Sequence, residues 1–110
     1  MEDDASLTLA LADDLDGTFE RLVRAHQDRL YSIALRMLGD PGEAEEAAQD
    51  ALVRAYRALA RYEPERIRDL QLRPWLATIV LNLCRSRLSR RPAATRRQVS
   101  LDDRLTGRRR

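Results

Sequence analysis

The feature that most constrains the fold is a stripe of small apolar residues at helical spacing in the middle of the chain. The stripe consists of Ala44, Ala47, Ala48, Ala51, Leu52, Ala55 and Leu59. Just before it, Asp40 is a favourable N-cap, Pro41 suits the first helical position and Glu43 completes a capping box. The pattern predicts a helix to about Arg61, whose alanine face lets a neighbouring helix approach closely.

Apolar residues recur at the same helical period before this segment, and the chain contains no alternating β-branched run. A short helix is expected over residues 5–14, and Asp16-Gly17 is expected to break it. A long helix is expected from Thr18 to Leu38, with Gly39 as its C-cap. The lone His26 lies on the apolar face of that helix, where we expect a packed, neutral side chain.

After the central helix we expect a polar connection over residues 62–73, with a short helical turn around Glu65–Leu70. Pro74 is expected to open a last helix that runs to about Arg91. Its predicted apolar face is Trp75, Leu76, Ile79, Val80, Leu83 and Leu88. The predicted fold class is therefore all-α: a compact bundle of three long helices plus a short N-terminal helix over residues 1–91, followed by an Arg-rich linker or tail at residues 92–110.

Several functional classes are disfavoured by what the sequence lacks. The single Cys84 cannot form an intramolecular disulfide, and one His and one Cys make no metal site of recognised spacing, so we expect no metal and no cofactor. There is no Gly-rich phosphate loop and no hydrolase motif, so an enzyme is not expected. No run of 18 apolar residues occurs, and the acidic start Met1-Glu2-Asp3-Asp4 is unlike a signal peptide, so we expect a cytoplasmic protein without a membrane span.

The charge is polarised along the chain although the net charge is only +2. Residues 1–50 hold four Arg and thirteen acids, a net charge of −9, whereas residues 51–110 hold sixteen Arg and five acids, a net charge of +11. All twenty basic residues are Arg, which genomic base composition explains better than a physical demand for the guanidinium fork. The asymmetry indicates two surfaces that serve different partners.

The first candidate surface is the acidic side of the central helix, formed by Glu43, Glu46, Gln49 and Asp50 with Glu45 beside them. Acids near a helix start also suit the helix dipole, which is the alternative explanation for the cluster. The second candidate surface is the polar side of the last helix, formed by Thr78, Asn82, Arg85, Ser86 and Ser89, with Arg87, Arg90 and Arg91 extending its charge. Such side chains suit contacts to phosphates and base edges, and a merely solvated basic face fits them equally well.

These segments resemble a known family. The segment Asp40–Leu52, followed by Arg54-Ala55-Tyr56, resembles the second conserved region of bacterial RNA polymerase sigma factors, most closely the extracytoplasmic-function (ECF) class. Arg73-Pro74-Trp75-Leu76, with Asn82-Leu83 and Arg87-Leu88 after it, resembles the promoter-reading segment of the same domain. The resemblance covers about residues 5–91 and includes the helix that precedes both motifs.

The resemblance implies a role in transcription initiation. In this family the acidic helix docks on the coiled coil of the polymerase β′ subunit, and the matching positions are Glu43, Glu46, Gln49 and Asp50. Members are commonly held inactive by anti-sigma proteins, so such a regulator is an expected partner. They also normally carry a second, helix-turn-helix domain, which this sequence lacks, so we expect one domain of a longer factor.

The resemblance also implies binding to the −10 element of promoter DNA by the last helix and the loop before it. Asn82 matches a position near the pocket for a flipped base, and residues 63–73 match the segment that sets base preference. The expected DNA-binding residues are Arg73, Thr78, Asn82, Arg85, Ser86, Arg87, Ser89, Arg90 and Arg91. A helical interaction module that binds a regulator, without sequence-specific DNA readout, is the competing interpretation.

Overall fold

The computed structural model describes residues 2–92, and the regular structure within that range is entirely helical. The helices are α1 (Asp4–Asp13), α2 (Leu15–Leu38), α3 (Pro41–Arg61), α4 (Pro64–Arg68) and α5 (Leu72–Arg90). The expected fold class is confirmed: three long helices pack together, with a short helix before them. Apart from Pro92, the expected Arg-rich tail lies outside the described residues.

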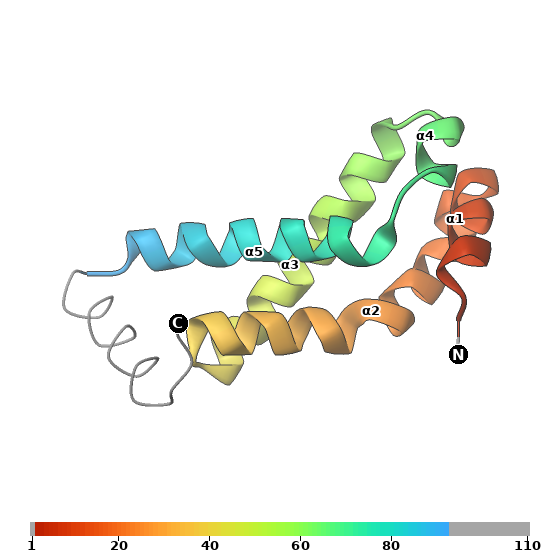
Figure 1. Ribbon diagram of the computed structural model, residues 1–110. Coiled ribbons are helices and arrows are strands. Elements are labelled where there is room, and N and C mark those ends of the chain that lie inside the picture. The colour runs from red at the N-terminus through yellow and green to blue at the C-terminus, as the bar shows by residue number, and fades with distance from the viewer. Residues whose placement is uncertain (1, 93–110) are drawn as a thin grey trace.

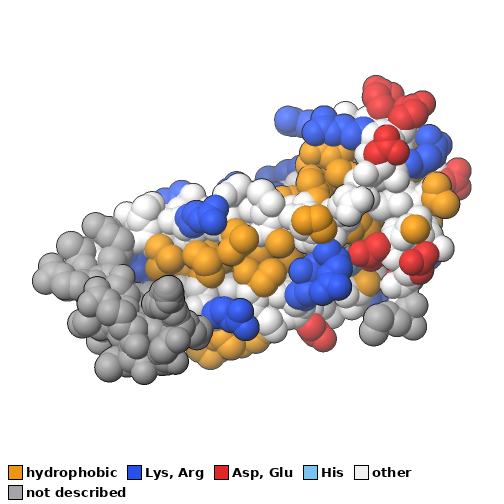
Figure 2. Space-filling view, in the orientation of Figure 1, with side chains coloured by type: hydrophobic (Ala, Val, Ile, Leu, Met, Phe, Trp, Pro, Cys, Tyr) orange, Lys and Arg blue, Asp and Glu red, His pale blue; other side chains and the backbone are white. Residues whose placement is uncertain are grey.

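The three long helices form the body of the molecule. In Figure 1, α2 and α5 run side by side while α3 crosses behind them, and α1 packs with α4 at one end of the pair. Figure 2 shows apolar side chains along the boundary between α5 and α2, with Arg side chains on both sides of it. This arrangement brings the C-terminal end of α5 next to the turn between α2 and α3.

The alanine stripe of α3 is the centre of the core, as the sequence indicates. All seven residues of the stripe are buried, each at most 9 % exposed. They face α2 and α5, whose own inward residues include the fully buried Leu22, Leu30 and Leu76. Small side chains on one helix and large ones on its neighbours allow the three helices to pack closely.

The turn between α2 and α3 follows the predicted signals. Gly39 ends α2 with φ 76°, a left-handed conformation that favours glycine. The Asp40 side chain caps α3 by accepting a hydrogen bond from the backbone N–H of Glu43, at 2.8 Å. The expected capping box is only half formed, because the Glu43 carboxylate turns to Arg91 at 2.8 Å.

The expected break at Asp16-Gly17 is wrong, since α2 already begins at Leu15. The Asp14 side chain caps α2 by accepting from the Gly17 N–H at 3.0 Å. A Cβ atom at Gly17 would collide with the Asp14 carboxylate in its capping position, so glycine suits the cap here rather than ending a helix. One residue, Asp14, therefore separates α1 from α2.

The last helix differs from its prediction in its start and in its inward face. It begins at Leu72, because a proline in the first turn gives up no intrahelical hydrogen bond. Its buried residues are Leu72, Leu76, Val80, Leu83 and Cys84. Trp75 and Ile79, expected on this face, are only half-buried at its edge. The Trp75 ring lies 6.1 Å from the ring of Tyr62, the C-cap residue of α3, so Trp75 packs against the end of that helix.

His26 is buried where α2 meets α1, which agrees with a packed side chain at a helix interface. Its Nε2 atom lies 3.0 Å from the Asp4 carboxylate, a partner that the apolar spacing does not reveal. That contact ties the start of α1 to the middle of α2. Within residues 2–92, none of the helices combines the length and the apolarity needed to cross a membrane.

Candidate nucleic-acid and protein interface

Three of the predicted docking acids lie where α3 meets α5, and they bind Arg87 of α5 and Arg91, the residue that caps α5. The Arg87 guanidinium donates to Glu46 and to Asp50, each at 3.2 Å. The Arg87 side chain is 22 % exposed, whereas the Glu46 and Asp50 side chains are 70 % and 56 % exposed. The carboxylates are thus held from one side and remain open to solvent on the other.

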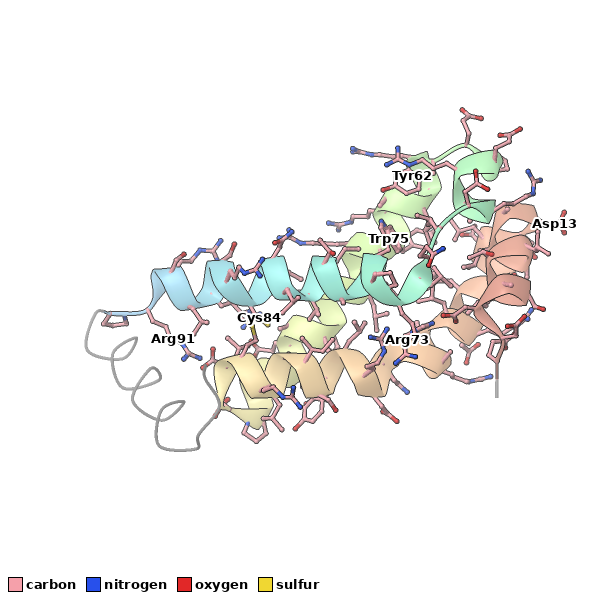
Figure 3. All side chains as sticks on the ribbon, viewed as in Figure 1. Asp13, Tyr62, Arg73, Trp75, Cys84 and Arg91 are labelled. Carbon is pink, nitrogen blue, oxygen red and sulfur yellow. The ribbon has the colours of Figure 1, made fainter. Side chains whose placement is uncertain are left out.

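Arg91 closes the same boundary at the end of α5. Its Nη2 atom donates to Glu43 at 2.8 Å and to the backbone carbonyl of Leu38 at 3.3 Å. Figure 3 shows Arg91 reaching from the end of α5 toward the end of α2. We call Glu43, Glu46, Asp50, Arg87 and Arg91 the charged seam. An open groove of about 440 Å³ runs along it.

The inward direction of these two Arg side chains follows from helical register. They lie three and seven residues after the buried Cys84, in line with Val80 and Leu76 before it. Burial works against the Arg87 charge, but its hydrogen bonds to Glu46 and Asp50 outweigh this effect and raise the pKa of Arg87. Extending the apolar spacing past Cys84 is the sequence signal that finds both Arg side chains.

Gln49, the fourth predicted docking residue, lies apart from the seam. It lines a shallow groove of about 370 Å³ between α3 and α2, together with Glu45 and with Asp28 and Tyr31 of α2. Val53, which sequence reasoning did not single out, lies on the same exposed side of α3 and is 47 % exposed. The predicted docking set therefore spreads over one broad side of α3, with an exposed apolar residue in it.

The predicted DNA-binding residues are divided by the same register. Thr78, Asn82, Arg85, Ser86 and Ser89 are exposed on the side of α5 that faces away from the core, which we call the outer face of α5. Arg90 is also exposed, at the edge of the seam groove. In the described part of the chain, the side-chain hydrogen bonds of Thr78, Asn82 and Arg85 all stay within α5.

Asn82 has one defined orientation on this face. Its amide oxygen accepts from Arg85 at 3.2 Å, and the guanidinium can only donate, so the oxygen must face it. The amide NH₂ group has no acceptor among residues 2–92. Asn82 therefore offers two donors to an incoming acceptor.

Arg29 of α2 joins the predicted site at the start of α5. It donates to the backbone carbonyl of Arg73 at 3.3 Å. Partial burial and then the nearby Arg73 charge lower the pKa of Arg29. Two positive side chains from different helices thus lie together, and neither forms an ion pair with a carboxylate among the described residues. Sequence reasoning missed Arg29 because it lies in the helix before both motifs.

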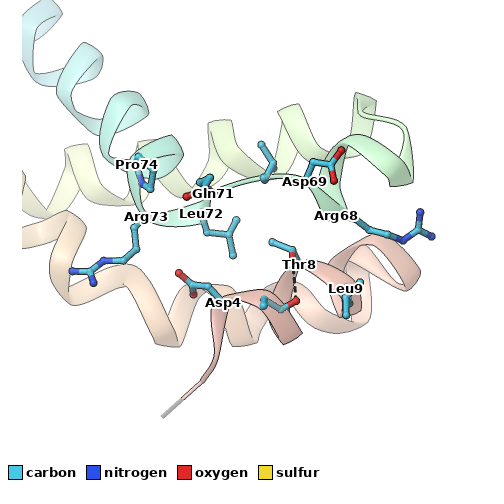
Figure 4. A pocket seen from close by; sticks show the side chains of 11 residues that line it. Asp4, Thr8, Leu9, Arg68, Asp69, Gln71, Leu72, Arg73 and Pro74 are labelled. Carbon is cyan, nitrogen blue, oxygen red and sulfur yellow. Dashed lines mark hydrogen bonds between the residues drawn. The ribbon is translucent and has the colours of Figure 1, made fainter.

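The segment expected to set base preference lines a groove against α1 (Figure 4). The groove measures about 530 Å³, and residues 68–74 form one wall while Asp4, Thr8 and Leu9 form part of the other. Buried Ile67 and Leu72 anchor this segment to the core. Asn82 does not line the groove, so the structure does not bring it together with the residues expected to set base preference.

Known proteins are similar to the part of the chain that holds both helices of the site, α3 and α5. The family described as Sigma-70 region 2 matches residues 22–93. The ECF RNA polymerase sigma factor SigE of Mycolicibacterium smegmatis is 32 % identical over 74 residues, covering 67 % of this chain and 27 % of the relative. SigW of Bacillus subtilis, also an ECF sigma factor, is 33 % identical over 73 residues, covering 66 % and 37 %.

A third relative, the RNA polymerase sigma-H factor of Pseudomonas aeruginosa, is 32 % identical over 77 residues, covering 67 % of this chain and 38 % of the relative. The chain thus spans between about a quarter and two-fifths of the length of these curated relatives. No solved structure matches the chain.

Proposed function

Because the chain belongs to the Sigma-70 region 2 family, we propose that it docks on RNA polymerase core through α3 and reads the −10 promoter element through α5 and the loop before it. Sigma factors are not enzymes, so this function consists of binding alone. The observation that carries the proposal is the family match over residues 22–93, since it includes both α3 and α5.

Docking is proposed at the broad exposed side of α3, through Glu43, Glu46, Gln49 and Asp50. The carboxylates of Glu46 and Asp50 are more than half exposed, so they can accept hydrogen bonds from a basic partner. Val53 supplies apolar surface beside them. An apolar centre with a charged rim is the usual composition of a protein interface.

Promoter contact is proposed at the outer face of α5, together with Arg73, Arg90 and the newly found Arg29. Arg side chains there supply affinity by neutralising phosphates, while Asn82 presents two donors that suit the acceptor atoms of a base. The groove beside residues 68–74 adds Arg68 and Gln71 from the segment that the family uses for base preference. This combination suits a single strand whose bases are unstacked.

Charge reversal tests the docking half. The double variant Glu46→Arg, Asp50→Arg should weaken binding to core polymerase, or to the isolated β′ coiled coil, by about tenfold or more, because attraction becomes repulsion. The control is Glu20→Arg on α2, an equally exposed acid distant in sequence from the docking side. Binding is measured by titration, and circular dichroism checks that helicity is kept. Equal affinity of the reversed and parent chains would contradict docking through α3.

Oligonucleotide selection tests the promoter half. The chain, bound to core polymerase, should enrich one sequence class from a randomised single-stranded pool and bind it more tightly than its scrambled version. A fluorescence titration at low salt measures both affinities. Equal affinities would remove the readout and leave the competing interpretation, an interaction module for a regulator.

A further inference from the structure

The charged seam matters for the role of α5, because Arg87 of this helix and Arg91, which caps it, contact the docking acids. The inference that follows rests on the proposed docking through α3. It concerns Arg87, which lies on the helix assigned to promoter contact, and Arg91, which caps the C-terminal end of that helix.

We propose that Arg87 and Arg91 are positioning residues of the polymerase-docking face, which hold the carboxylates of Glu43, Glu46 and Asp50 in one row, and that they do not contact promoter DNA.

Geometry is the first argument. Arg87 and Arg91 continue the buried line of α5, and their side chains are only 22 % and 12 % exposed. The outer face of α5, which carries Asn82 and Arg85, points the other way. A DNA strand that contacts Asn82 meets the outer face, so the seam lies on the far side of the helix from it.

Charge is the second argument. Glu46 and Asp50 are four residues apart on α3, a spacing at which two carboxylates repel one another. Arg87 lies between them and donates one nitrogen to each at 3.2 Å. Taking Arg87 away for a phosphate would leave that repulsion uncompensated. The bridge therefore favours keeping Arg87 in the seam while the exposed oxygens of both acids stay available.

The third argument is the attachment that Arg91 provides. It donates both to Glu43, near the start of α3, and to the Leu38 carbonyl at the end of α2. One guanidinium thus joins three helices at the end of the molecule where the docking acids begin. The position of the Glu43 carboxylate therefore depends on Arg91 at the end of α5, although the acids of the charged seam all belong to α3.

The test uses conservative variants on the same helix. Arg87→Lys keeps the charge but loses the planar fork that reaches two carboxylates, whereas Arg85→Lys makes the same change on the outer face. Arg87→Lys should weaken binding to core polymerase by about two- to fivefold, in line with the modest strength of exposed ion pairs. Arg85→Lys should leave that affinity unchanged. Thermal melting of both variants separates a docking effect from loss of the fold.

A double-mutant cycle gives a readout that a purely structural role does not move. Glu46→Gln and Arg87→Lys each remove part of the same bridge, so their effects on polymerase affinity should not add. The matched pair Glu46→Gln with Arg85→Lys should add. Additive effects in the first pair, or an affinity of Arg87→Lys equal to or tighter than that of the parent, would overturn the positioning role.

DNA binding supplies the other half of the test. The salt dependence of binding to the selected single strand should stay unchanged in Arg87→Gln and should fall in Arg85→Gln by about 0.7 in the logarithmic slope, the value for one lost phosphate contact. An equal fall of the salt slope in Arg87→Gln would show that Arg87 contacts promoter DNA. If the parent chain binds neither polymerase nor DNA, the proposed function fails, which is distinct from a failure confined to the Arg87 variants.

Discussion

Arg85 and Arg87 are two residues apart on one helix, yet they belong to different regions of the molecule. Arg85 lies on the outer face of α5, exposed, and donates to Asn82 of its own helix. Arg87 lies in the charged seam, largely covered, and donates to two acids of α3. Two steps along an α-helix turn a side chain by about 200° around the axis, and that rotation accounts for the contrast.

The comparison of Arg85 with Arg87 shows that, on a helix with many Arg residues, the residue type alone does not predict which group each side chain contacts. The composition of α5 suggests a single positive surface, but the Arg87 side chain forms ion pairs with Glu46 and Asp50 within the molecule. The seam leaves three acids and two Arg side chains together, so the docking side of α3 is less negative than its sequence indicates. Variants can test whether the two regions are as separate as the contacts indicate.

The largest effect is expected from a change that harms both regions together. Leu76 is fully buried in the core that supports both regions, so Leu76→Ala should lower the free energy of unfolding by about 2–5 kcal/mol, through lost burial and a residual cavity. Denaturant titration measures the loss. Polymerase and DNA binding should decline together once the variant is partly unfolded. A loss below about 1 kcal/mol would show that the core does not depend on this contact.

Asn82→Ala should affect the outer face alone. Losing its two donors should reduce discrimination between the selected and scrambled strands by about 1–3 kcal/mol, while polymerase affinity stays unchanged. Paired titrations with both strands and with core polymerase measure this. Ser32→Ala, an exposed serine of α2 outside the proposed site, is the control for a small polar truncation. Unchanged discrimination in Asn82→Ala would remove this side chain from the site.

Arg29→Gln should have a smaller effect that extends the outer face onto α2. It should reduce the logarithmic salt slope for single-stranded DNA by about 0.7, because one phosphate contact is lost, without changing sequence preference. Binding measured across a salt series gives the slope. Arg24→Gln, on the same helix and paired with Glu20, is the control. A steeper or unchanged slope would place Arg29 outside the DNA path.

The smallest effect is expected from the thiol of Cys84, which is buried on the inward face of α5 one helical turn before Arg87. Burial raises the pKa of its thiol, against a smaller opposing effect of the Arg87 charge. The unfolded chain therefore ionises at lower pH than the folded one, so this contribution to stability is intact below the ordinary thiol pKa of about 8.5 and is lost as pH rises above it. Thiol labelling in the folded chain should be slow at pH 8 and fast in denaturant. Fast labelling without denaturant would show that α5 separates from the core in the folded chain.

Much of the fold follows from periodicity, because the apolar residues of α2 and α3 repeat over several turns. The seven buried positions of α3 match their prediction, since Asp40 fixes where the helix begins and alanines fix which side can be covered. The stripe of α5 is less regular: Trp75 and Ile79 look equivalent to Leu76 and Val80 in hydrophobicity, and only packing against α3 decides between them.

The candidate site was harder to predict than the fold. The family motif finds Glu46, Asp50 and Asn82, but it does not say which charges meet. Ion pairs across 37 and 41 residues, from Asp50 and Glu46 to Arg87, depend on how α3 crosses α5. The role of Gly17 is hidden in the sequence for a related reason, since it depends on the direction of the Asp14 side chain, which accepts from the Gly17 N–H.

The stack of Arg66 on Tyr62, with Trp75 beside it, has a practical consequence. The Arg66 guanidinium lies 3.8 Å from the centre of the Tyr62 ring, and that ring is 6.1 Å from Trp75. Trp75 is the only tryptophan in the sequence, so its ultraviolet emission comes from a single known place. The chain therefore carries its own optical label where α3, α4 and α5 meet, and no dye is needed to follow that junction in solution.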